Sequence, residues 1–130
     1  MLAIKNSGDK FRQAAKEGRI NDVQNLIERG AIKDDADEVG KTALYLAAAN
    51  DHLNVVQYLN EQGADKDKAT NVGWTALLAA AHYGHLRVVQ YLVEQGAAKD
   101  KSTNEDASPL YVAAQDGHFS VVQYLSLIHI

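Results

Sequence analysis

A pattern of 33 residues recurs along this chain without insertion or deletion, and it constrains the fold more than any other feature. Its clearest copies are Gly40–Ala64 and Gly73–Ala97, a third begins at Asp106, and a looser one spans Asp9–Ala31. One column of the repeat holds the same residue in every copy: Val23, Val56, Val89 and Val122. A fixed period of this length is typical of architectures in which one small unit stacks on copies of itself.

Each copy carries the pattern of a first short helix that ends at a turn. Thr75 can cap such a helix by accepting from a nearby backbone N–H. Leu77, Ala80 and Ala81 form a narrow apolar stripe at helical spacing. Gly84 allows the left-handed backbone that ends a helix. The small alanine side chains predict that first helices of neighbouring units approach closely.

A second helix is predicted to start at His85. Val88, Val89 and Leu92 face inward by helical spacing, and Gly96 ends the helix with another left-handed residue. No single unit buries enough surface to be stable alone, so the stack must supply the core.

Four-residue boxes open the three later copies: T-A-L-Y at Thr42–Tyr45, T-A-L-L at Thr75–Leu78 and S-P-L-Y at Ser108–Tyr111. Together with an alanine pair, Gly-His and Val-Val pairs and a Gly-Ala ending, they make the unit resemble the ankyrin repeat, whose box is Thr-Pro-Leu-His. The resemblance implies an all-α fold: an ankyrin-type solenoid of stacked helix-turn-helix repeats with short β-hairpin fingers.

The connectors between helix pairs are polar, and the resemblance implies that they project as the fingers. Asp65–Asn71 and Lys99–Asn104 are predicted to fold as such β-hairpins. Ala43 and Ala76 stand where the family has proline. This departure can loosen individual helix starts but does not threaten the fold.

The repeat accounts for nearly all of the 130 residues, so we expect a single ankyrin repeat domain. Its units are predicted at residues 1–33, 34–66, 67–99 and 100–130. The first is expected to be an N-terminal cap, because its outward positions are polar and a solenoid end lacks a neighbour. Within it, Met1–Gly8 is predicted to be a loosely ordered lead-in to helices at Phe11–Lys16 and Asn21–Glu28.

Asp51 breaks the pattern, since the other copies have Gly18, Gly84 and Gly117 at this position. A left-handed backbone costs an aspartate about 1 kcal/mol. We therefore expect a strained but retained turn, and we expect glycine at this position to stabilise the fold.

The last unit departs from the repeat after Leu125. Where the pattern requires a sequence such as V-E-Q-G-A, the chain has Ser126–Ile130, which makes the last helix apolar and leaves it without a polar cap. Translated back into codons, Leu125–Ile130 resembles a transposase adaptor used in sequencing libraries. We therefore expect the natural chain to continue past Leu125; a natural hydrophobic ending that pairs with another surface is the alternative.

Charge and composition exclude several classes of partner. The net charge of −4 argues against nucleic acid and acidic membrane surfaces, which attract a positive face. The chain has no cysteine, no apolar run near the roughly 18 residues of a membrane helix, and no secretion signal at its start. We expect a cytoplasmic protein, with a nuclear location possible.

The histidines do not predict a metal site. His52, His85 and His118 share one repeat position and should form a ladder. Packed helices lie about 8–10 Å apart, whereas zinc ligands converge at about 2.0–2.1 Å. His82 is three residues from His85, but Gly84 interrupts the helix that would align them. In the family, the ladder histidine hydrogen-bonds one unit to the next, and that role is expected here.

Other chemical signals are weaker still, and we expect no enzyme, no cofactor and no metal. No serine lies in a nucleophile-elbow motif, and Ser108 is most simply a helix cap. No glycine-rich phosphate loop occurs. Tyr58, Tyr91 and Tyr124 form a second ladder, whose expected role is packing along the second helices.

The positions that differ between otherwise similar units carry the functional prediction. In ankyrin-like proteins, such positions line the concave face and hairpin tips that contact partners. Trp74 is the only tryptophan, is expected on an exposed finger, and forms with His82 and Tyr83 the predicted centre of the site. The predicted protein-binding residues are Val39, Lys41, Ala49, Asn50, Asn71, Val72, Trp74, His82, Tyr83, Gln115 and Asp116. The alternative for Trp74 is packing against its neighbouring finger.

The sequence therefore predicts a non-enzymatic module that binds another protein through its concave face and hairpin tips. A monomer is expected, with possible self-association through the uncapped last unit. The alternative is a regulatory or targeting part of a larger protein, such as a kinase, a channel or a ubiquitin-ligase component, whose catalytic part is absent here. A purely structural spacer is a third possibility.

Overall fold

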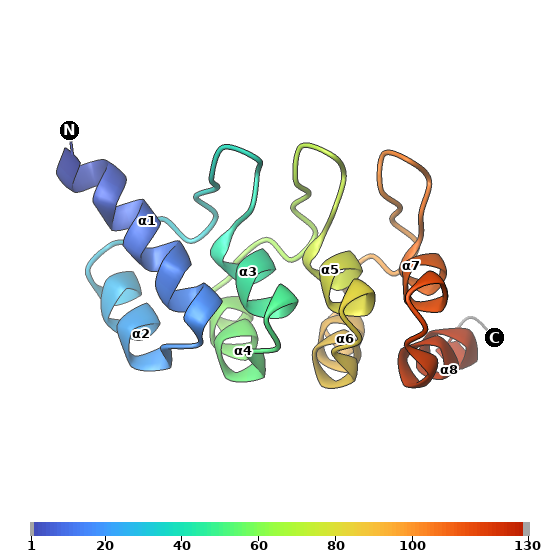
Figure 1. Ribbon diagram of the computed structural model, residues 1–130. Coiled ribbons are helices and arrows are strands. Elements are labelled where there is room, and N and C mark those ends of the chain that lie inside the picture. Colours follow the sequence, from blue (N-terminus) through green and yellow to red (C-terminus); the bar gives the residue numbers. More distant parts are fainter. Residues whose placement is uncertain (1, 129–130) are drawn as a thin grey trace.

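The computed structural model describes residues 2–128, and the side chains of residues 2–7 lie outside that description. In this part of the chain the regular structure consists of helix pairs set side by side in one row (Figure 1). The helices are α1 (Leu2–Glu17) with α2 (Ile20–Glu28), α3 (Ala43–Ala49) with α4 (Leu53–Glu61), α5 (Ala76–His82) with α6 (Leu86–Glu94), and α7 (Pro109–Gln115) with α8 (Phe119–Ile128). This confirms the predicted all-α repeat solenoid.

The first helices of the later pairs begin where the sequence places a hydroxyl side chain. The Oγ1 of Thr75 accepts a hydrogen bond from the backbone N of Leu78 at 3.2 Å. Thr42 and Ser108 cap α3 and α7 in the same way. Pro109 occupies the first helical position of α7, where its missing N–H costs nothing. The two helices that have alanine there start in the same register, so their departure from the family box leaves the fold intact.

The turns between paired helices use a left-handed residue. Gly18, Gly84 and Gly117 have φ of 75°, 75° and 76°, and Asp51 adopts 63° in their place. The turn at Asp51 is therefore retained, as predicted. At Gly84 a Cβ would also overlap the ring of His118 in the next pair, so close approach adds to the preference for glycine.

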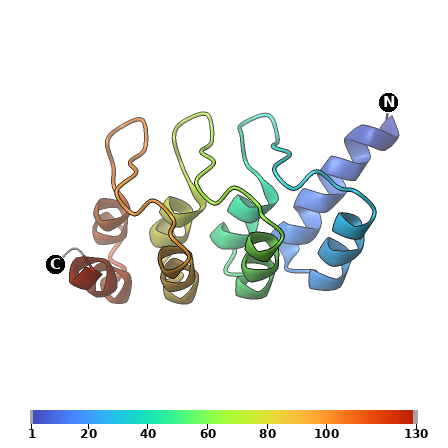
Figure 2. The same cartoon turned by 180° about the vertical axis from the view of Figure 1, so that it is seen from behind.

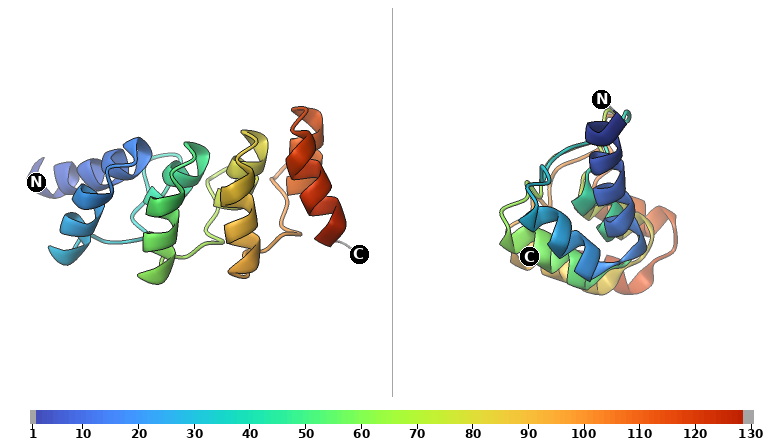
Figure 3. Two further views of the ribbon diagram at one scale, coloured as in Figure 1. Left: turned by 90° about the horizontal axis from the view of Figure 1, so that it is seen from below. Right: turned by 90° about the vertical axis from the view of Figure 1, so that its left-hand side faces the viewer.

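Small side chains bring the first helices into a tight row. The residues predicted to face inward in the third pair are all buried: Leu77, Ala80, Ala81, Val88, Val89 and Leu92. First helices of neighbouring pairs contact each other more extensively than second helices do. Successive first helices are therefore more closely spaced than successive second helices. Figure 3 shows the row from two further sides. We call the surface formed by the first helices and the fingers the inner face.

Histidines join the third and fourth helix pairs to the pair before each of them. The Nε2 of His85 lies 3.0 Å from the carbonyl oxygen of Ala49, and that of His118 lies 2.8 Å from the carbonyl oxygen of His82. These carbonyls end α3 and α5, where a helix leaves its last acceptors without helical partners. The contacts are the unit-to-unit hydrogen bonds that the family resemblance implied.

The connectors project from the helices as a row of fingers (Figure 2), but they are not β-hairpins. No residue in the described part of the chain is in a β-strand. In the second finger the backbone N of Thr70 donates to the oxygen of Trp74 at 2.8 Å, which closes a turn. The tips bond sideways: the N of Asn71 donates to the oxygen of Val39 at 3.0 Å, and the next tip repeats this bond. Each of these fingers is therefore closed by a turn, and its tip is joined to a neighbouring tip by a backbone hydrogen bond.

The two ends of the described chain differ in part from expectation. The lead-in predicted for the first eight residues is wrong from Leu2 onward, because α1 already begins there. That segment has no proline, and Gly8 inside a helix costs only about 1 kcal/mol. At the other end, α8 continues through the predicted tail to Ile128 and leaves Phe119 and Leu127 71% and 68% exposed. His129 and Ile130, also part of that tail, lie outside the described residues.

Candidate protein-binding surface

A groove of about 400 Å³ crosses the inner face between the first two fingers. Its walls come from both fingers, from α3 and from the end of α5. The lining residues are Val39, Lys41, Tyr45, Thr70, Asn71, Val72, Trp74, His82 and Tyr83. All of these except Tyr45 and Thr70 are among the predicted binding residues, so the structure brings most of that set together around one cavity.

Trp74 lies at the base of its finger rather than on an exposed part of it, so the expectation of an exposed tryptophan is wrong. Its side chain is half-buried and packs against the hydrophobic core. The backbone N of Trp74 donates to the Oγ1 of Thr70 at 3.1 Å. Because the chain from Thr70 to Trp74 closes into a turn, residue 74 returns to the helix layer. The indole nevertheless lines the groove and remains available to a ligand there.

Aromatic rings form a continuous wall of the groove. The ring centroids of Trp74 and His82 are 5.3 Å apart, and those of His82 and Tyr83 are 4.6 Å apart, both in edge-to-face arrangements. Tyr83 is 53% exposed, and Val39 and Val72 on the finger tips are 50% and 60% exposed. The groove thus combines a packed aromatic wall with large apolar side chains that are accessible.

The opposite wall holds a phenol and an ammonium group. The Nζ of Lys41 lies 6.0 Å from the centroid of the Tyr45 ring, at the outer range of a cation–π contact. Burial raises the pKa of Tyr45, and the neighbouring Tyr83 phenol and Asp37 carboxylate act in the same direction. Tyr45 therefore stays a neutral hydroxyl at neutral pH.

The two lining residues missed by the sequence reasoning differ in how they could have been found. Tyr45 belongs to the four-residue box, but its column also holds Leu78 and Tyr111 and never the family's histidine. That variation in residue type is the signal that could have singled out Tyr45, although Leu78 in the same column is buried. Thr70 lies in the stem of a finger, and no local signal distinguishes it from Thr103 one repeat later.

The remaining predicted residues lie at the ends of first helices, outside the groove. Asp116 makes a side-chain hydrogen-bond contact with His82 and so borders the groove from the α7 side. The Nδ2 of Asn50 donates to the oxygen of Leu46 at 2.7 Å. The carbonyl of Ala49 receives the histidine contact described above, and Gln115 is exposed at the end of α7. None of these four residues lines the groove itself.

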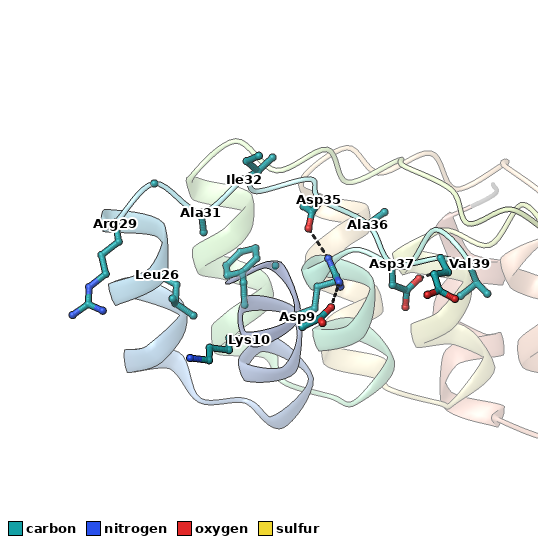
Figure 4. Close-up of a pocket in the computed structure, with 15 residues that line it drawn as sticks. Asp9, Lys10, Leu26, Arg29, Ala31, Ile32, Asp35, Ala36, Asp37 and Val39 are labelled. Atoms are coloured by element: carbon teal, nitrogen blue, oxygen red, sulfur yellow. Dashed lines mark hydrogen bonds and ion pairs between the residues drawn. The ribbon is translucent and has the colours of Figure 1, made fainter. Parts of the chain in front are cut away.

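A larger hollow of about 950 Å³ lies between α1 and the segment that leads into the first finger (Figure 4). Arg12 crosses it and ion-pairs with Asp9 and with Asp35, each at 2.6 Å. Both carboxylates already neutralise this cation, and its side chain is only 12% exposed. Of the predicted binding residues, Val39 alone lines this hollow. The polar groups of this hollow join α1 to the connector between α2 and α3.

The tyrosines and histidines considered for cofactor or metal binding make contacts within the fold. The ring of Tyr91 packs against the core, as those of Tyr58 and Tyr124 do, and its hydroxyl accepts from Asn60 at 3.0 Å. Among the described residues, no group of three or more histidine, cysteine or acidic side chains is placed to hold a metal ion. Across residues 2–128, every helix is too short or too polar to cross a membrane.

Comparison with known proteins agrees with this architecture. The family model described as ankyrin repeats (3 copies) matches residues 11–70 and 62–129. No curated protein matches the chain. Because the two matched segments together take in nearly all of the helix pairs described above, the chain belongs to the ankyrin repeat family.

Proposed function

We propose that this chain is a protein-binding module whose partner docks in the groove bordered by Trp74 and Tyr83. The observation that supports this most strongly is the convergence of non-repeating residues on one cavity. The repeated positions are buried in the core between stacked units. At the finger tips and helix ends, by contrast, the large apolar side chains of Val39, Val72 and Tyr83 are exposed. Exposed apolar groups next to aromatic rings are typical of interaction sites. Ankyrin repeats generally bind other proteins and are generally not catalysts.

The groove is rigid because its fingers support one another. The sideways bond from Asn71 to Val39 fixes two tips relative to each other, and the His82 contact with Asp116 extends this framework to the next pair. A preformed surface loses less conformational entropy when a partner binds. Rigidity of this kind supports a recognition role more than a role as an inert spacer.

The test compares two exposed tyrosines. Tyr83, in the groove, is 53% exposed, and Tyr111, on α7 away from the groove, is 58% exposed. Tyr83→Ala is expected to weaken binding of proteins or peptides selected on the native chain by about tenfold or more. Tyr111→Ala is expected to leave that binding unchanged. Equal affinities for the native chain and Tyr83→Ala would remove the groove as the binding site.

A second candidate function is association with another copy through the outer surface of α7 and α8. Four apolar residues there are less buried than their counterparts one repeat earlier: Leu110, Tyr111, Ala114 and Val122, compared with the buried Leu77, Leu78, Ala81 and Val89. In the earlier pair the next pair covers this surface. The other end of the array exposes polar residues such as Gln13, Lys16 and Asn25. We therefore propose that two copies meet through the same apolar face.

We further propose that residues 1–130 form one domain of four units and that the protein is cytoplasmic or nuclear. The alternative role is that of a regulatory part of a larger protein. Extending the reading frame past Leu125 in the source DNA tests the last of these. Because one scaffold can bind unrelated targets, the kind of partner must follow from the chemistry of the groove.

A further inference from the structure

The polar side chains at the base of the groove already have partners within the chain. The Oγ1 of Thr70 accepts from the backbone N of Trp74 at 3.1 Å, and the Nδ2 of Asn71 donates to the oxygen of Glu38 at 3.0 Å. Lys41 lies beside the Tyr45 ring. The accessible lining that remains is mainly aliphatic and aromatic. A large apolar side chain gains free energy on entering such a cavity, whereas a polar one loses water without a new partner.

Carboxylates border the groove on both sides. Glu38 and Glu105 are exposed on the tips of the first and third fingers, which flank the second finger, and neither has an ion-pair partner among the described residues. The residue before Glu105, Asn104, donates its backbone N to the oxygen of Val72 at 3.1 Å, which holds that tip against the groove wall. On the helix side, the carboxylate of Asp116 contacts His82. Even without Asp116, which His82 already contacts, Glu38 and Glu105 outnumber Lys41, the single lysine or arginine that lines the groove.

We propose that the partner of this groove is an extended protein segment with one large aliphatic or aromatic side chain flanked by lysine or arginine. This inference rests on the proposed binding function and specifies its partner. The apolar side chain enters between Val72 and Tyr83, and the flanking cations lie near Glu105 and Asp116 on one side and Glu38 on the other. The acidic border attracts such a segment and repels acidic segments of equal hydrophobicity, so charge supplies selectivity while apolar contact supplies affinity.

The experiment selects ligands without assuming a partner. Random 12-residue peptides on phage are panned on the native chain after depletion on the Tyr83→Ala variant, which retains only groove-dependent ligands. Enriched peptides without tryptophan are synthesised with a fluorescein label and titrated by anisotropy. Emission of Trp74, the only tryptophan of the chain, reports independently whether the groove is occupied.

The expected enriched peptides carry a net positive charge and at least one leucine, isoleucine, methionine or phenylalanine. Glu38→Lys and Glu105→Lys should each weaken their binding by about two- to fivefold, in line with exposed ion pairs. Higher salt should weaken it as well, because exposed charges are screened. Glu61→Lys, on α4 and outside the groove, makes the same charge change and should leave affinity unaltered at matched ionic strength.

The outcomes separate the two proposals. Groove-dependent peptides that are acidic or uncharged, or that bind Glu105→Lys as well as the native chain, overturn the basic-segment inference and leave the binding function intact. Selection that yields no groove-dependent peptide, or peptides that bind Tyr83→Ala equally, overturns both.

Discussion

The imidazole of His82 stands edge-on to the indole of Trp74, with ring centroids 5.3 Å apart and ring planes at 73°. One ring comes from the base of a finger and the other from the end of α5, so the contact fixes the finger relative to the helix layer. Because Asp116 pairs with the same imidazole, the connection continues into the next helix pair. The candidate binding groove is therefore part of the framework that holds the stack together.

This placement predicts different consequences for substitution of Trp74 and of Tyr83. An exposed Trp74 would tolerate Trp74→Ala without a change in melting temperature. The half-buried ring packs against the core, so its removal should lower the melting temperature. The loss in free energy of unfolding should be smaller than the about 3–5 kcal/mol that removal of a fully buried aromatic side chain costs. Tyr83→Ala should leave thermal unfolding followed by circular dichroism nearly unchanged. If Trp74→Ala melts like the native chain, the packing described here is incorrect.

Close contact between finger tips predicts that Gly73 tolerates no side chain. A Cβ there would lie 2.7 Å from the backbone N of Asn104, at a φ of 85°. Gly96 has a similar φ of 90° but nothing within 4 Å of such a Cβ. Gly73→Ala should therefore destabilise the fold by about 1–3 kcal/mol more than Gly96→Ala in urea unfolding. Equal losses would mean that the tips do not touch in solution.

Relief of backbone strain predicts a stabilising substitution at Asp51, whose φ is 63°. Asp51→Gly should raise the free energy of unfolding by about 1 kcal/mol. Its carboxylate also lies 3.8 Å from the Nδ1 of His85, so Asp51→Asn serves as a control that removes the charge and keeps the strain. Asn should be close to neutral. A less stable glycine variant would show that the contact with His85 outweighs the strain.

The apolar face of α7 and α8 predicts a concentration-dependent dimer. Sedimentation velocity should show the native chain shifting from monomer to dimer as concentration rises, and Ala114→Glu, within that exposed face, should keep it monomeric. Ile32→Glu, at the opposite end of the array where Ile32 is 73% exposed, should leave the dimer intact. A native chain that stays monomeric at high concentration, or a dimer lost with Ile32→Glu, contradicts this second candidate.

The repeat allowed most of the architecture to be predicted, because periodic positions and capping residues act locally. Thr75, Gly84 and Val89 have in the structure the roles that their spacing indicates. The fingers project as expected but contain no β-strand among the described residues, and the bond from Asn71 to Val39 joins neighbouring units, for which local sequence carries no signal. Asp106 illustrates the same limit.

Asp106 adopts a φ of 66° at the register position of Gly40 and Gly73, a departure that the sequence reasoning overlooked. At Gly40 and Gly73 an added Cβ would meet the backbone of the next finger, whereas the tip that holds Asp106 has no further finger beside it among the described residues. The candidate site, like the fold, was predicted only in part. Non-repeating positions located the groove, but the burial of Trp74 depends on a turn that only the folded chain reveals.

The most direct test of the account is a map of ligand-induced shifts in the ¹H–¹⁵N spectrum of the chain, measured with a peptide selected as above. The account predicts that the largest shifts fall on the Trp74 indole N–H and on the backbone amides of Val39, Val72 and Tyr83. Shifts concentrated instead on α4 and α6, with the indole signal unmoved, would contradict it.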